Sequence, residues 1–219
     1  MGGNVPSDSI STGTINIIAG SLNESGTVRL LTRGLNACAE DFQTPSFRRA
    51  LSFSQGQATE VASNVAKMLP LESGVGSQCI DSPLVLLVQS LNDPDTALQY
   101  IGQELLGNNA ALHIRFWNTF ASQPELQHLA KYSIRDVWID VGTSLPMKLS
   151  YVERSGGDSA PAFPMDTFFS DFRTVGTLQY PFSINRSLNG TPWITARIQN
   201  IRFNTGLTSV DFPVGEWEP

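Results

Sequence analysis

Charged residues are scarce in this chain, making up 16% of its 219 residues, against about 25% in an average soluble domain. The 20 acidic residues outnumber the 14 basic ones, and the formal net charge is −6. A nucleic-acid-binding surface needs a basic face that displaces counterions from phosphates. We therefore expect no nucleic-acid partner.

Long apolar runs are also missing. The richest run, residues 83–88, is far shorter than the roughly 18 residues that a membrane-spanning helix needs. We expect no transmembrane segment. We also recognise no basic-then-apolar signal peptide in the sequence. We expect a single domain over residues 1–219, with residues 1–10 as a disordered start.

Cysteine is represented only by Cys38 and Cys79, which form no C-x-x-C motif and so do not indicate redox catalysis. Two alternatives stay open for this pair. A disulfide would close a long loop and stabilise the fold by about 3–4 kcal/mol in an oxidising compartment. Otherwise both are buried free thiols. The two histidines, His113 and His128, have no second ligand at metal-binding spacing, so we expect no metal site.

Catalytic fingerprints are absent as well. The chain has no nucleophile-elbow, P-loop or dinucleotide-binding motif. Its acids Asp136, Asp140, Asp166 and Asp171 could in principle form a general acid/base pair, but isolated acids near strand ends are more often solvated or paired with arginine. We predict no catalytic residue, no cofactor and no enzyme activity. A hydrolase with an unrecognised acid pair stays as a third and weaker option.

The sequence is rich in short β-type segments separated by polar turns. Residues 12–19 and 27–32 are predicted to form a hairpin, and residues 47–53 a third strand. In the second half, strands are predicted over 137–141, 147–151, 165–173, 179–188 and 193–203.

Two hairpins have a predictable register. Pairing Val137 with Leu149 puts the apolar residues on one face. It also sets Trp138 against Lys148 as a cation–π pair.

The second hairpin turns at Asn189-Gly190, the strongest turn signal in the chain. The apolar pattern prefers Ile184 beside Ala196. That pairing requires a three-residue turn or a β-bulge near residues 189–191.

Helix signals are fewer. Ser82 can cap a helix over residues 83–91. Its apolar stripe is formed by Leu84, Leu87, Val88 and Leu91. A shorter helix is predicted over residues 124–132. Residues 59–69 fit both the helical and the strand period.

The C-terminal part resembles a known family. Residues 137–148 resemble the W-I-D-x-x-T-x-L-P-x-K hairpin of LolA-like lipoprotein carriers, and residues 169–181 resemble their F-x-D-Y-R-x-V-x-G-x-x-x-P strand pair. The resemblance covers residues 135–213. It implies a mainly β fold with a few helices (α+β), a curved antiparallel sheet or half-open β-barrel with helices covering the concave face. On this ground we predict strand for residues 59–69.

The resemblance also implies a periplasmic or cell-envelope protein whose signal segment has been removed. The many aromatic residues either fill an ordinary β core or line an apolar cavity. In the second case the protein binds a hydrophobic small molecule, a lipid or a lipoprotein acyl chain. The candidate lining residues are Leu84, Leu87, Val88, Leu91, Trp117, Trp138, Phe168, Phe182 and Trp193. The alternative is a protein–protein interaction or regulatory module of the envelope, with a filled core and an exposed apolar patch that binds an envelope protein partner.

Overall fold

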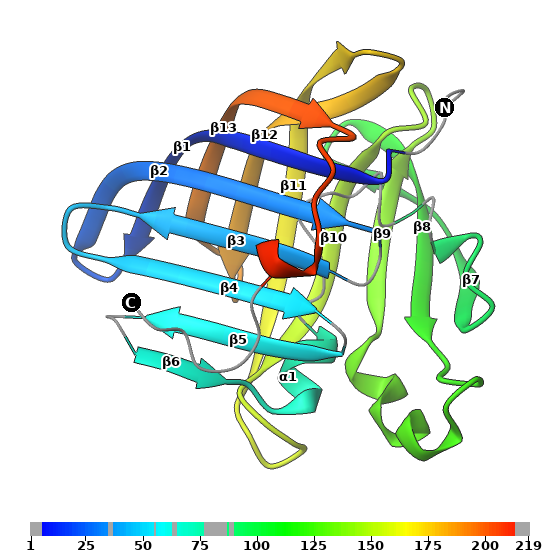
Figure 1. Ribbon diagram of the computed structural model, residues 1–219. Coiled ribbons are helices and arrows are strands. Elements are labelled where there is room, and N and C mark those ends of the chain that lie inside the picture. The colour runs from blue at the N-terminus through cyan, green and yellow to red at the C-terminus, as the bar shows by residue number, and fades with distance from the viewer. Residues whose placement is uncertain are drawn as a thin grey trace.

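The computed structural model describes residues 6–34, 37–54, 56–62, 65–76, 87 and 90–212. In this part of the chain, all thirteen strands join one antiparallel sheet (Figure 1). The elements are β1 (Asp8–Ala19), β2 (Leu22–Arg33), β3 (Ala37–Gln43), β4 (Arg48–Ser54), β5 (Gln57–Ala62), β6 (Val65–Met68), α1 (Leu71–Gly76), β7 (Thr96–Leu106), β8 (Asn109–Asn118), η1 (Pro124–Tyr132), β9 (Arg135–Asp140), β10 (Pro146–Arg154), β11 (Ala162–Val175), β12 (Leu178–Leu188), β13 (Thr191–Phe203) and η2 (Ser209–Asp211).

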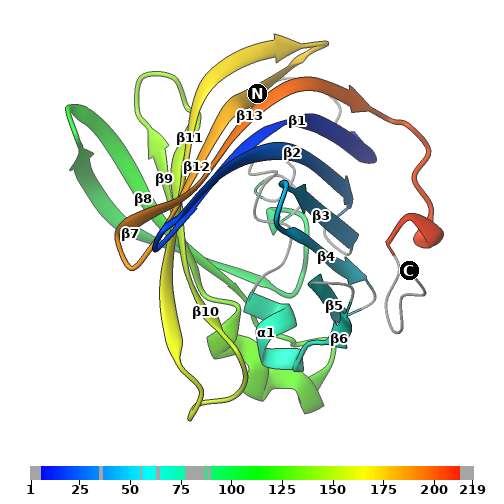
Figure 2. The same cartoon turned by 90° about the vertical axis from the view of Figure 1, so that its left-hand side faces the viewer.

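The first and the last strand of the described residues pair with each other in the middle of the sheet. The strand order is β6-β5-β4-β3-β2-β1-β13-β12-β11-β10-β9-β8-β7, so β1 pairs with β13 while β6 and β7, from the middle of the chain, form the edges. These edges do not pair with each other, and the sheet stays open. It curls into two arms, β1–β6 and β7–β13, that face each other across a concave side (Figure 2).

Two glycines permit close backbone approaches in the curled sheet. A Cβ atom on Gly13 would lie 2.0 Å from the carbonyl oxygen of Arg197, and one on Gly26 would lie 1.8 Å from that of Gln43. Gly13 stands at a register shift between β1 and β13. Glycine inside a strand often marks such a bulge or close approach.

The Asn189-Gly190 hairpin has the predicted strand pairing. Ile184 lies opposite Ala196, and the required register shift falls between Arg186 and Ser187. The turn itself has two residues, with φ angles of 49° and 75°, as a type I′ turn requires. The bulge therefore sits in the strands rather than in the turn.

The β9–β10 hairpin also matches its predicted register. Val137 pairs with Leu149 and Trp138 with Lys148, followed by a register shift at Pro146. The Nζ atom of Lys148 lies 4.7 Å from the centre of the Trp138 ring. The expected cation–π contact is present.

The N-terminal arm contains the expected hairpin β1–β2 and the expected strand β4. Residues 59–69 contribute to two strands, β5 and β6, as the resemblance favoured over a helix. Strand β3 was not predicted, because Glu40 and Asp41 interrupt its apolar pattern. β1 begins at Asp8, so the segment expected to be disordered already belongs to the sheet at Asp8–Ile10.

Helical structure is limited. The predicted helix at residues 124–132 is present as a 3₁₀-helix, η1, and the short helix α1 was not predicted. Most of the helix predicted over 83–91 lies outside the described residues, including Leu84 and Val88. Within the described part, the amide of Leu91 donates to the carbonyl of Leu87 (3.2 Å).

Candidate ligand-binding site

The centre of the concave face carries a large apolar cluster. Seventeen buried residues from both arms form one apolar cluster, against which Leu87 and Trp193 pack. A small space of about 10 Å³ lies beside Phe42, Ile184 and Arg186.

A buried ion pair joins the two arms across this cluster. The Nη1 and Nη2 atoms of Arg186 on β12 donate to the carboxylate of Glu40 on β3, at 3.1 Å and 2.8 Å. The exposed fractions of the two side chains are 5% and 9%. Three strands, β2, β1 and β13, separate β3 from β12 in the sheet. The pair therefore ties the two arms of the curled sheet together.

A larger cavity of about 470 Å³ lies at the ends of strands β2, β3 and β4. Its other walls are the helices α1 and η1, the segment before η1, and the start of η2. The apolar lining residues are Ala37, Phe53, Leu71, Val75, Phe120, Leu126 and Leu129. The polar lining residues are Arg33, Ser54, Gln123 and Ser209.

Helix α1 forms one wall of this cavity and is held by both arms. It contacts β5 and β10 (Figure 2). The Nη2 atom of Arg135 on β9 donates to the carbonyl of Val75 at 2.8 Å, and the hydroxyl of Ser73 donates to the carbonyl of Arg154 at 2.6 Å. A Cβ on Gly74 would lie 3.3 Å from the Cβ of Ala58, so α1 packs tightly on β5. These contacts fix the cavity wall.

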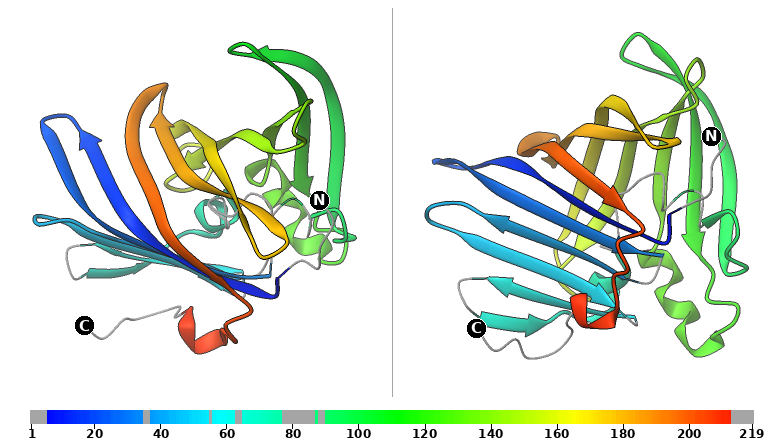
Figure 3. Two further views of the ribbon diagram at one scale, coloured as in Figure 1. Left: turned by 90° about the horizontal axis from the view of Figure 1, so that it is seen from above. Right: turned by 45° about the horizontal axis from the view of Figure 1, so that its top comes forward.

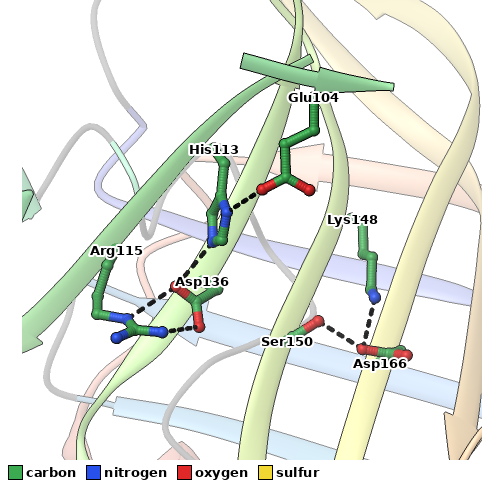
Figure 4. A network of polar contacts seen from close by, with 7 residues as sticks. All are labelled: Glu104, His113, Arg115, Asp136, Lys148, Ser150 and Asp166. Atoms are coloured by element: carbon green, nitrogen blue, oxygen red, sulfur yellow. Dashed lines mark hydrogen bonds and ion pairs between the residues drawn. The ribbon is translucent and has the colours of Figure 1, made fainter. Parts of the chain in front are cut away.

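The outer face of the sheet carries a separate polar cluster (Figure 4). His113 on β8 bridges Glu104 (Nδ1···Oε1, 2.5 Å) and Asp136 (Nε2···Oδ1, 2.9 Å). Arg115 donates twice to Asp136, at 2.9 Å and 3.0 Å. His113 also stacks on Trp138, with ring centres 4.2 Å apart. The cluster thus links β7, β8 and β9.

A second set of polar contacts continues this face. Asp166 on β11 accepts hydrogen bonds from Ser150 and, at 2.9 Å, from Lys148 of β10. Asp136 and Asp166 both line an open cleft of about 400 Å³. Two of the sequence-predicted acids therefore share this cleft.

The electrostatics of Asp136 do not favour a role as a general acid. Burial raises the pKa of Asp136, but the hydrogen bonds from Arg115 and His113 outweigh it and hold the pKa below its ordinary value. A carboxylic general acid needs a raised pKa. Asp171 is likewise paired with Arg173, which lowers its pKa.

Within the described residues, no group of His, Cys, Asp or Glu is arranged to hold a metal ion.

Among the candidate lining residues that the structure describes, not all share one surface. Phe182 belongs to the central cluster, and Leu87 and Trp193 pack against it. By strand alternation, Trp117, Trp138 and Phe168 point to the outer face. Leu91 is 67% exposed. Leu84 and Val88 lie outside the described residues, as does Cys79, and Cys38 is buried beside Phe53 and Ala58.

The residues that line the large cavity were not singled out from the sequence. Phe53 and Leu129 each look like an ordinary apolar residue of a strand or a short helix. Their common cavity results from the meeting of β4 with η1, which are remote in sequence. The one usable signal was the apolar side of the 124–132 helix, Leu126 and Leu129.

Comparison with known proteins gives a result for the fold alone. No protein-family model and no curated protein matches the chain. A LolA superfamily protein from Nitrosomonas europaea has a similar structure, with a TM-score of 0.61 at 10% sequence identity over 95% of this chain and 91% of that one. A putative outer membrane lipoprotein-sorting protein domain from Vibrio parahaemolyticus gives 0.57 at 12% identity, over 94% and 88% of the two chains.

A DUF1329 family protein from Desulfovibrio piger is similar too, with a TM-score of 0.61 at 13% identity over 96% of this chain and 91% of that one. The fold is therefore that of LolA-like proteins, and the resemblance seen in the C-terminal motifs is confirmed at this level. In the described part of the chain, no helix is long and apolar enough to span a membrane.

Proposed function

We propose that this protein is a non-enzymatic envelope protein that binds one acyl chain, or a hydrophobic molecule of similar size, in the cavity between β4, α1 and η1. The observation that carries the proposal is this cavity, with seven apolar residues among its lining. Its volume of about 470 Å³ falls within the roughly 300–1,000 Å³ of small-molecule sites. The likeness in fold to a lipoprotein-sorting domain supports the same class of ligand.

Burial of an acyl chain in this cavity would release enough free energy for binding. Each buried methylene group contributes about 0.8 kcal/mol, so ten of them would contribute about 8 kcal/mol before the costs of ordering the ligand. Arg33 lies on the cavity wall and is exposed, and it would suit the polar end of such a ligand. We further propose that the helix predicted over 83–91 covers the concave face, since Leu87 packs against the central cluster.

Native mass spectrometry of the purified protein, followed by solvent extraction, tests the proposal. We expect a discrete adduct of acyl-chain mass, or uptake of the fluorescent fatty acid cis-parinaric acid by the extracted protein. Leu126→Arg places a charge in the apolar lining and should abolish uptake. Val65→Arg, at a residue of β6 that is 66% exposed, is the matched control and should leave uptake unchanged. A bare protein that takes up no fatty acid would refute the proposal.

A second candidate is the interaction module, with no ligand. The apolar cluster at the centre of the concave face favours it, as do the large apolar residues exposed on β7. A bare protein that recovers one envelope protein under crosslinking would support this candidate over the first.

A further inference from the structure

The two edges of the sheet are protected to different degrees. Edge strand β6 has four residues, includes Lys67 and is followed by Pro70. Edge strand β7 has eleven residues and contains no lysine, arginine or proline. Short strands, lysines and prolines are the devices that stop an edge from pairing with another chain. Only the β6 edge has them.

Strand β7 also exposes apolar side chains. Leu98, Tyr100, Ile101 and Leu105 are 46%, 63%, 43% and 75% exposed. The β7–β8 hairpin projects away from the rest of the sheet (Figures 2 and 3). No strand of the described residues pairs with the outer edge of β7. The strand thus offers both a row of peptide groups and an apolar surface.

The inner-face side chains of β7 are spaced symmetrically about the β-bulge in this strand. Leu98 and Tyr100 pair with Phe116 and Ile114 of β8, which belong to or pack against the central cluster. A register shift then falls between Tyr100 and Gly102. Because of this shift, Gln103 and Leu105 lie on the same inner face as Leu98 and Tyr100. The inner-face set is therefore Leu98, Tyr100, Gln103 and Leu105. Its spacing is the same in both directions along the strand, and a leucine stands at each end.

The charge on this strand is already compensated within the chain. Glu104 is the one ionisable side chain of β7 apart from Tyr100, and it is bound to His113 at 2.5 Å. The hydrogen bond with His113 lowers the pKa of Glu104. Two copies of β7 side by side would therefore not bring together two unpaired carboxylates, which would repel each other.

We propose that β7 is a self-association edge, at which two copies of this chain pair their β7 strands in antiparallel fashion. A twofold axis at the bulge sets Leu98 of one copy opposite Leu105 of the other, and Tyr100 opposite Gln103. All four lie on one face, as a continuous sheet requires. This inference does not depend on ligand binding, because β7 contributes no residue to the large cavity.

Sedimentation equilibrium of the full chain over a range of concentrations tests the proposal, and we expect a dimer. Leu98→Lys or Leu105→Glu alone should weaken the dimer by roughly tenfold or more, because each new charge then faces a leucine of the other copy and has no partner of opposite charge. The double variant Leu98→Lys/Leu105→Glu should restore it, because each lysine then faces a glutamate of the other copy. Val210→Lys, at a residue 82% exposed outside β7, should change nothing.

Hydrogen exchange gives a second measurement that does not depend on variants. The β7 amides should be protected more strongly at concentrations where the dimer forms. A protein that stays monomeric throughout, or a dimer that both single variants leave intact, would overturn the proposal. A double variant that stays as weak as the single ones would overturn the assigned register.

Discussion

The ion pair between Arg186 and Glu40 gives a sharp test of how the sheet is held in its curled form. We consider Arg186→Met, which keeps the length of the side chain and removes its charge. At a separation of 2.8 Å, two unit charges attract by about 6 kcal/mol at an effective dielectric constant of about 20. Desolvation offsets part of this attraction, so the pair itself adds little net stability.

The single variant is costly because it removes the positive charge and the two hydrogen bonds that Arg186 supplies to the buried carboxylate of Glu40. Removing one member of a buried pair typically costs about 3–5 kcal/mol. Arg49 also attracts Glu40, which places our expectation near the lower limit, about 3 kcal/mol. Glu40→Met should cost a similar amount, whereas Glu40→Met/Arg186→Met should cost much less than the two single variants together, since neither charge is then stranded.

Urea unfolding followed by tryptophan fluorescence measures these three free energies and the wild-type reference. We expect a coupling free energy of about 3 kcal/mol or more from the double-mutant cycle. Two single variants that each cost less than about 1 kcal/mol, well below the range for a broken buried pair, would refute the reasoning. So would strictly additive effects, because they would mean that the two side chains do not stabilise each other.

Three further changes have clear expected outcomes. Gly13→Ala should destabilise the protein by several kcal/mol in thermal unfolding, because its Cβ would lie 2.0 Å from the carbonyl oxygen of Arg197, and a backbone atom cannot yield cheaply. Burial raises the pKa of Asp8, but hydrogen bonds from Thr205 outweigh it and lower the pKa overall. The stability contributed by Asp8 is therefore present above about pH 4, the ordinary Asp pKa, and is lost in acid, so Asp8→Asn should differ from wild type at pH 7 and converge with it near pH 2. Arg135→Met should speed hydrogen exchange in α1, whose carbonyls Arg135 holds.

Each of these changes has its own control. Gly156→Ala adds the same methyl group at a place where the nearest atom is 3.5 Å away, and it should leave stability unchanged. A Gly13→Ala variant as stable as this control would contradict the close approach. An Asp8→Asn difference that persists undiminished at pH 2 would contradict the role of the ionised carboxylate. Exchange in α1 that ignores Arg135→Met would show that packing alone holds the helix.

The sheet could be predicted largely because its signals are local. The Asn189-Gly190 turn and the alternation around Val137 and Leu149 define both strands and register within a few residues. The β-bulge near the turn was predictable because Ile184 has to face the core. Strand β3 was not predicted, because Glu40 points inward and interrupts the apolar pattern of the buried face. A buried charge at this position is expected only when its distant partner, Arg186, is known.

The site could not be predicted in the same way, because its residues share no local pattern. Trp138 and Phe168 are large and apolar, which suggested a cavity lining, yet strand alternation places them on the outer face beside Lys148. Which face of a strand is concave depends on the curl of the whole sheet. The cavity beside Phe53 and Leu129 arises from contacts between elements that no single motif connects.

The pairing of β1 with β13 has a consequence for how the chain folds. Ser9 lies opposite Phe203, so the central seam of the sheet joins residues that are 194 positions apart. Strands β1–β6 and β7–β13 each form from neighbouring hairpins, which close quickly. Pairing the two half-sheets needs β13, the last strand of the described residues, and closing so long a loop is entropically slow. The two half-sheets therefore form before the complete sheet. Until β13 pairs with it, the edge of β1 is exposed to other chains.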